Sequence, residues 1–255
     1  MNKGLEIHVS CLAAKLKVAV IFAVVFASCA HYRQVRISHV IAGVKASSDK
    51  IRTIKALAQV KLSVKGKVYR YRYSIVAVRE GSYRVEIFPQ NAAKGVFAAV
   101  SDGRSSLFLD FVKHRKASYS DSNRALREIF GVNIKGGDLV WILSGLLPGR
   151  LIKDPNKVVT CPAEYSLCYF KNALGYKKIS FYPRTLRLQA LEFFSNVAGA
   201  LPARLEYSGT KNREGFLFPD VIVIRGRGIE AEIKLSVVRI NEKVDRGLFD
   251  PSYLM

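Results

Sequence analysis

The order of apolar and polar residues changes its period along this chain of 255 residues. Between Ser47 or Ser48, which can cap a helix, and Ala58, the apolar residues recur at helical spacing and predict a helix. From Val60 the period becomes two, which is typical of half-buried strands. Patterns of this kind follow one another as far as Ser120 without an intervening helix, which predicts an antiparallel meander.

Two short helical patterns interrupt the strands in the middle of the chain. The first is predicted over Asn123 to Phe130 and ends at Gly131, a residue that favours helix termination. The second covers Leu139 to Leu147, with Asp138 as its cap, and it is apolar on nearly every side. A helix without a polar face has to be enclosed by the rest of the fold.

Strand patterns resume between Val158 and Ile240, and the chain as a whole predicts about ten or eleven antiparallel strands. A strongly bent sheet is the natural way to wrap the central helices. We therefore predict a mainly β fold with a helical insertion, a half-open antiparallel β-barrel lidded by short helices. With no internal repeat or interdomain linker, residues 47–255 are expected to form a single domain.

The N-terminal region has the pattern of a secretory signal peptide. A polar, basic segment is followed by an unbroken apolar run from Val18 to Phe26 and by the small residues Ala27 and Ser28. The run is too short to cross a hydrocarbon core of roughly 30 Å. We predict a signal peptide over residues 1–28 and a tether over residues 29–46.

The residues around Cys29 favour lipid attachment. Phe26, Ala27, Ser28 and Cys29 resemble the bacterial lipobox, in which an apolar residue and two small ones precede a lipidated cysteine. Each buried CH₂ of an attached acyl chain contributes ~0.8 kcal/mol to membrane anchoring. The alternative is an ordinary cleaved signal followed by an incidental cysteine.

Two other cysteines remain once Cys11 leaves with the signal and Cys29 is acylated. They are Cys161 and Cys168, and in an oxidising compartment the short loop between them suits a disulfide. The alternative is a pair of free thiols. No spacing in the chain supports a metal site at these cysteines.

A net charge of +21 indicates a surface that attracts anions. An exported protein does not meet the genome, so nucleic acid is not expected as a partner. Anionic lipid headgroups are the partner that fits both the charge and the compartment.

Catalysis has little support in the sequence. The chain has 4 histidines, and they are scattered without a triad or a metal-binding cluster. We therefore expect a protein that is not an enzyme, with no catalytic residue and no metal.

Two apolar features remain as candidate functional sites. The central helix carries a set of large side chains that either lid an acyl-binding cavity or simply fill the core: Trp141, Ile142, Leu143, Leu146 and Leu147. The segment from Pro89 to Phe97 forms a predicted tip that could present Val96 and Phe97 to a membrane.

The central helix pair is similar to that of the LolA/LolB superfamily, and of LolB-like outer-membrane lipoproteins in particular. The resemblance rests mainly on Ala125–Val132 and Gly137–Pro148, with support from the lipobox and from Arg84–Pro89 running into a Gly-containing loop. It implies a curved antiparallel sheet whose helices lid an acyl-binding cavity. It also implies that the only cofactor is the covalent lipid on Cys29.

The resemblance further implies lipoproteins or phospholipids as ligands and a LolA-like periplasmic carrier as a partner. Because Ala30 rather than Asp follows Cys29, it implies the periplasmic face of the outer membrane. LolB members use an exposed Leu on an early loop for insertion. The matching loop, Pro89 to Gly95, has no Leu, and Val96 or Phe97 could substitute for it. The rival hypothesis is a structural envelope lipoprotein that binds an anionic polymer or lipid through a basic face, without an acyl cavity.

Overall fold

The computed structural model describes residues 50–132, 134–147, 159–161, 167–173, 176–193, 203–226 and 228–250. Strands dominate these residues. Their bounds are β1 (Thr53–Val64), β2 (Lys67–Val78), β3 (Tyr83–Pro89), β4 (Phe97–Ser101), β5 (Ser106–Asp110), β6 (Arg115–Tyr119), β7 (Val159–Thr160), β8 (Cys168–Ala173), β9 (Tyr176–Tyr182), β10 (Arg187–Phe193), β11 (Arg204–Arg213), β12 (Phe216–Gly226) and β13 (Ile229–Ile240). The helical elements are α3 (Arg124–Phe130), η1 (Gly136–Asp138), α4 (Leu139–Ser144) and η3 (Arg246–Phe249).

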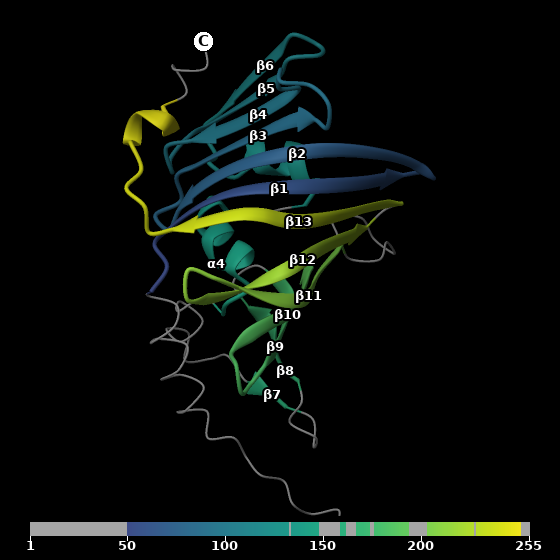
Figure 1. Ribbon diagram of the computed structural model, residues 1–255, viewed down its shortest axis with the longest axis vertical. Helices are drawn as coiled ribbons and strands as arrows, with labels where there is room; N and C mark the ends of the chain where they lie inside the picture. The colour runs from purple at the N-terminus through teal and green to yellow at the C-terminus, as the bar shows by residue number, and fades with distance from the viewer. Residues whose placement is uncertain are drawn as a thin grey trace, which may run out of the picture. The chain divides into compact units, whose positions relative to one another are not determined.

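The described strands form one 13-stranded sheet in the order β6-β5-β4-β3-β2-β1-β13-β12-β11-β10-β9-β8-β7 (Figure 1). Each strand pairs antiparallel with its neighbours. The last strand, β13, returns to pair with the first, β1, and so joins the two halves of the sheet. Strands β6 and β7 are its two edges, and the described residues do not pair them with each other, so the sheet stays open.

The sheet bends around helix α4. This helix contacts both β2 and β12, which are separated in the sheet by β1 and β13. Strands lie about 4.8 Å apart, so one short helix reaches both only if the sheet curves toward it. Helix α3 covers β4 and β5. This arrangement confirms the predicted half-open antiparallel barrel with short helices, with more strands than the ten or eleven expected.

The helix predicted from Ser47 or Ser48 to Ala58 is wrong in its described part, because β1 already begins at Thr53. Burial along β1 alternates, with Ile54, Ala56 and Ala58 facing the core. Leu57, one of the apolar residues whose spacing predicted a helix, is 49% exposed on the other face. Backbone pairing with β2 and β13 on both sides outweighed this local pattern.

The two central helices are confirmed, with one change in length. Helix α3 ends at Gly131, whose φ of 69° is the left-handed conformation that glycine adopts readily. Helix α4 ends earlier than expected, since Gly145 takes the same conformation with a φ of 65°.

The predicted signal peptide (1–28), Cys29 and the tether (29–46) lie outside the described residues. Within those residues, every helix is too short or too polar to cross a membrane.

Gly136 holds the start of the central helices close to the sheet. A Cβ at this position would lie 2.5 Å from the backbone oxygen of Gly81 and 2.9 Å from the ring of Tyr83. Its amide also donates a hydrogen bond of 3.0 Å to the Asn123 side chain. The close approach therefore requires glycine.

We expect Gly136→Ala to lower the free energy of unfolding by about 1–3 kcal/mol, because the added methyl group would push the backbone at residue 136 away from that at Gly81. Chemical denaturation measures this change. The neighbouring Gly137→Ala is the matched control, since its Cβ would meet nothing nearer than 3.5 Å. Equal losses in the two variants would contradict the role of close approach.

Candidate functional site

Helix α4 is buried on all sides, as its apolar sequence predicted. All six of its residues are buried, and Trp141, Ile142 and Leu143 are each at most 8% exposed. Leu147, just beyond the helix, is 1% exposed, whereas Leu146 is half-buried. These are the side chains that the sequence proposed as the lining or lid of an acyl cavity, and here they pack in the interior.

Asp138 anchors the N-terminal end of α4. It occupies the N-cap position, as predicted, but its side chain makes no cap hydrogen bond. Instead, the fully buried carboxylate accepts hydrogen bonds from Trp141 Nε1 at 3.1 Å and from the Tyr176 hydroxyl at 2.8 Å. The rings of Trp141 and Tyr176 also meet edge to face, with centroids 5.7 Å apart. A buried carboxylate needs such donors, and these ones tie α4 to β9.

The C-terminal end of α4 is joined to the start of β10. The Leu188 amide donates a 2.8 Å hydrogen bond to the Gly145 carbonyl, and the Leu147 amide donates to Leu186 at 3.3 Å. The Arg187 guanidinium donates to the Ser144 carbonyl at 3.1 Å and to the Leu217 carbonyl. A cation near the last carbonyls of a helix is electrostatically favourable.

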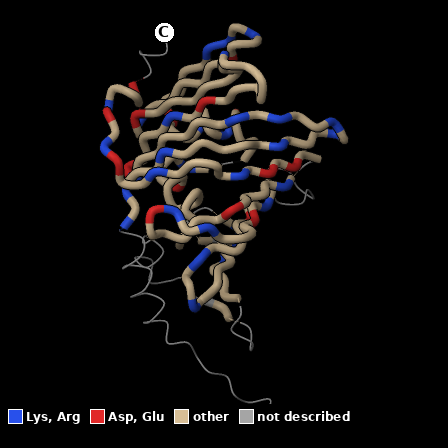
Figure 2. Tube along the Cα trace, viewed as in Figure 1, with Lys and Arg blue, Asp and Glu red and all other residues tan. Residues whose placement is uncertain are grey.

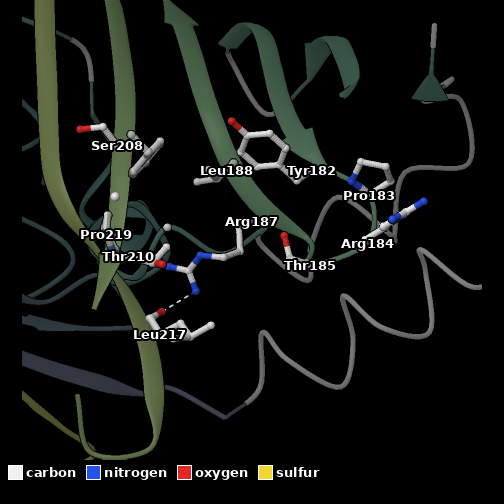
Figure 3. Close-up of a pocket in the computed structure, with 13 residues that line it drawn as sticks. Tyr182, Pro183, Arg184, Thr185, Arg187, Leu188, Ser208, Thr210, Leu217 and Pro219 are labelled. Atoms are coloured by element: carbon white, nitrogen blue, oxygen red, sulfur yellow. Dashed lines mark hydrogen bonds between the residues drawn. The ribbon is translucent and has the colours of Figure 1, made fainter. Parts of the chain in front are cut away.

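A pocket of about 830 Å³ opens beside this junction (Figure 3). Its lining is mostly apolar, and its residues are Gly145, Tyr182, Pro183, Arg184, Thr185, Arg187, Leu188, Tyr207, Ser208, Gly209, Thr210, Leu217 and Pro219. Gly145, which follows the last residue of α4, is the lining residue nearest that helix in the chain. Trp141, Ile142, Leu143, Leu146 and Leu147 are not part of this lining, so a ligand would contact them only if α4 moved.

The pocket lies where strands β10 and β11 separate. Among the described residues, their ladder pairs Ala190–Glu192 with Arg204–Glu206, and the Phe193 amide donates to the Ala203 carbonyl beyond it. Before Ala190, the Leu188 amide of β10 donates its hydrogen bond to the Gly145 carbonyl at the end of α4 rather than to β11. The residues of β11 that follow Glu206 therefore leave β10 and flank the pocket from its other side.

Two polar side chains of the lining, Arg187 and Tyr207, are half-buried, whereas its other polar residues are exposed. Arg187 is half-buried, and burial lowers the pKa of its guanidinium below the ordinary value. The Tyr207 hydroxyl is shielded from solvent and has no hydrogen-bond partner within the described residues. Burial raises the pKa of Tyr207 well above its ordinary value, and the Arg187 charge lowers it by a smaller amount. Tyr207 therefore stays protonated and can donate a hydrogen bond.

Sequence reasoning missed this pocket. Arg187 and Tyr207 are common residue types at unremarkable strand positions, and their proximity depends on where the β10–β11 pairing ends. In the sequence, Leu186 and Arg187 follow a turn and are equally typical of the start of an ordinary strand, so they do not indicate a pocket.

The other predicted site residues lie elsewhere. Phe97 begins β4, half-buried, and stacks on Phe108 with ring centroids 6.0 Å apart. Val96, also half-buried, precedes it and donates its amide to Ile87 at 2.7 Å, so both belong to the sheet margin. Cys161 and Cys168 form a disulfide beside β8.

In the part of the chain that the structure describes, His, Cys, Asp and Glu side chains nowhere gather in groups of three or more that could hold a metal ion. The buried Asp138 carboxylate is not a member of such a group, and it accepts hydrogen bonds from Trp141 and Tyr176.

Solved structures of low sequence identity have the same fold. A LolA superfamily protein from Nitrosomonas europaea gives a TM-score of 0.56 at 14% identity, covering 85% of this chain and 98% of its own. A DUF1329 family protein from Desulfovibrio piger gives 0.59 at 11% identity, covering 86% and 98%. A domain from Vibrio parahaemolyticus, named for outer membrane lipoprotein sorting, gives 0.52 at 12% identity, covering 85% and 97%.

No family model and no curated protein matches the chain by sequence. At these low identities, the structural likeness shows a shared fold. The fold that the LolB-like resemblance implied is thereby confirmed.

We expect Tyr176→Phe to lower the free energy of unfolding by about 1–3 kcal/mol, because the buried Asp138 carboxylate loses a donor. Thermal or chemical denaturation measures it. Tyr69→Phe is the matched control, since this tyrosine is 42% exposed, and its change should stay within about 0.5 kcal/mol. A Tyr176 variant as stable as the control would show that the hydrogen bond contributes nothing.

Proposed function

We propose that this chain is a lipid-anchored lipoprotein on the periplasmic face of the outer membrane. There it binds the acyl chains of lipids or lipoproteins and aids their localisation to that membrane. The proposal is supported by the fold shared with a LolA superfamily protein and with a domain named for outer membrane lipoprotein sorting. It requires binding and release without bond chemistry, and no cofactor beyond the covalent lipid on Cys29.

The observation that carries the proposal is the pocket between α4, β10 and β11. Its volume of about 830 Å³ lies in the range of roughly 300–1,000 Å³ that is usual for small-molecule sites. Its lining is mostly apolar, with Leu188, Leu217 and Pro219 among its residues. Each CH₂ of a bound chain that leaves water there contributes ~0.8 kcal/mol, so an acyl chain can be held without specific chemistry.

Helix α4 acts as the lid in this proposal. Its two ends are held differently, by the buried Asp138 carboxylate at one end and by hydrogen bonds to β10 and Arg187 at the other. Movement of the β10 end would let acyl chains exchange contacts with Trp141, Leu143 and their apolar neighbours. Those side chains would then line the enlarged cavity, as the sequence suggested.

The proposed partner is a LolA-like periplasmic carrier that delivers cargo. The lipid on Cys29 and the tether over residues 29–46 would keep the domain at the membrane. Val96 and Phe97 are proposed as a membrane-contact segment beside the loop that follows β3.

A structural lipoprotein with a basic face is the alternative, and one surface favours it. The outer face of the sheet has a groove of about 380 Å³ whose charged lining residues are Lys61, Arg70, Arg72, Lys234 and Glu232. Lys61 lies between Arg70 on β2 and Glu232 on β13, so the cations outnumber the single carboxylate. Lys65 and Lys67 lie at the turn joining β1 and β2, and Lys and Arg positions are spread along these strands in Figure 2. This surface fits an anionic polymer, but it leaves the apolar pocket without a role.

We expect the Leu217→Gln variant to bind a neutral diacylglycerol about fivefold more weakly than the unaltered chain, because an amide replaces apolar surface at the pocket. The full chain carrying Cys29→Ser is used, and calorimetry measures Kd. Leu57→Gln is the matched control, since Leu57 is 49% exposed on the outer face and Leu217 is 51% exposed. A chain that binds no diacylglycerol would overturn the proposed function and leave the basic face as the better explanation.

We expect the unaltered chain, expressed in a Gram-negative host, to incorporate labelled palmitate and to stay in the membrane fraction after a high-salt wash. The wash removes attachment by surface charge alone, since salt screens such contacts. Cys29→Ser should abolish both the label and the membrane attachment. Cys11→Ser is the matched control, because the predicted signal peptide carries that cysteine away. Retention of label in the Cys29 variant would rule out lipidation at this residue.

A further inference from the structure

Arg187 differs in its partners from Arg204 and Arg225. It resembles Arg213, which donates to the carbonyls of Leu235 and Ser236, but Arg213 is not part of the pocket lining. Arg204 forms ion pairs with Glu192 and Glu206, and Arg225 with Glu206 and Glu230. Within the described residues, Arg187 pairs with no carboxylate, and its partners are the carbonyl oxygens of Ser144 and Leu217. Its positive charge is therefore retained inside a mostly apolar pocket.

Tyr207 brings a second hydrogen-bond donor to this pocket. Its hydroxyl is shielded from solvent and lacks a hydrogen-bond partner among the described residues. Burying a polar group costs stability unless something hydrogen-bonds to it, so such an oxygen in a pocket wall is suited to meeting a ligand. Arg187 and Tyr207 both line this pocket, from β10 on one side and β11 on the other.

The two groups together suit an oxyanion. A guanidinium has five N–H donors in a planar fork, and two carbonyl contacts leave donors for a ligand. Phosphate oxygens accept such forked hydrogen bonds well. Figure 3 shows Arg187 directed toward Leu217 in the pocket, whereas Arg184 points away from it at the rim. Arg187 is thus the cation available inside.

We propose that the pocket selects an anionic phospholipid, whose phosphate binds Arg187 and Tyr207 while its acyl chains lie against the apolar lining. This inference rests on the proposed acyl-binding function and names the class of cargo. The acyl chains of a bacterial lipoprotein are joined to its cysteine through neutral ester, amide and thioether groups. A phosphate site therefore favours phospholipid over lipoprotein as the molecule bound here.

The test compares three probes with the full chain carrying Cys29→Ser. Dihexanoyl phosphatidylglycerol and dihexanoylglycerol share their acyl chains and differ in the phosphate, and inorganic phosphate has no chains. Both lipids are used as monomers, so that the basic surface of the protein meets no vesicle. Calorimetry measures each Kd, and we expect the phospholipid to bind at least about tenfold more tightly than the neutral lipid.

Tyr207→Phe is the decisive variant, because it removes one oxygen that no described residue uses. We expect it to weaken phosphatidylglycerol binding about tenfold, to leave dihexanoylglycerol binding unchanged and to leave Tm unchanged or higher. Tyr69→Phe is the matched control, because Tyr69 is exposed and is not part of the pocket lining. It should change neither Kd.

A second pair of variants tests the charge. Arg187→Gln should remove the preference for the anionic lipid, whereas Arg104→Gln, which removes the same charge from an exposed turn, should retain it. If Arg187→Gln does not fold, the tyrosine pair decides the question alone.

The outcomes separate this inference from the function on which it rests. Equal affinity for the two lipids, or phosphatidylglycerol binding that ignores Tyr207→Phe, would overturn the phosphate site and leave acyl binding intact. Inorganic phosphate that binds as tightly as the phospholipid would also overturn it, in favour of a site for free phosphate. Failure of both lipids to bind would overturn the proposed function itself.

Discussion

Helix α4 has no polar face, and the rest of the fold is arranged to enclose it. All six of its residues are buried, and the helix contacts strands on both sides of the β1–β13 pair. A flat sheet covers only one side of a helix, so enclosure requires curvature. The return of β13 to β1 makes the curved sheet continuous across the two halves of the chain. The half-open barrel follows from burying this one apolar segment.

The way in which α4 ends also determines where the sheet opens. Gly145 ends the helix in a left-handed conformation, and its carbonyl accepts the Leu188 amide at the start of β10. That amide is then not used in pairing with β11, whose ladder with β10 begins only at Ala190 opposite Glu206. The pocket occupies the resulting separation. The same glycine thus connects the buried helix to the candidate ligand site.

Charge is distributed unevenly over this framework. Arg204, Arg225 and Arg239, on β11, β12 and β13, form ion pairs with nearby carboxylates. Such pairs add little stability at an exposed surface, but they offset the local positive charge. The groove on the outer face is lined by Lys61, Arg70, Arg72 and Lys234 and by one carboxylate, Glu232. This excess of positive charge is compatible with an anionic membrane nearby. The half-buried Arg187 retains its charge inside the pocket, where weaker screening makes each contact with an anion stronger.

The sequence by itself determined the antiparallel meander, the two central helices and the need to enclose the second one, because these depend on local periodicity and on glycine at helix ends. It failed at β1, where an exposed Leu57 imitated a helical stripe and pairing on both sides decided otherwise. It placed Asp138 at the cap but not its bonds to Trp141 and Tyr176, since Tyr176 lies 38 residues away. Only the tertiary structure could bring Arg187 and Tyr207 into one pocket. The pocket exists because the Leu188 amide donates to the Gly145 carbonyl rather than to β11, and a sequence pattern does not show which carbonyl an amide will meet.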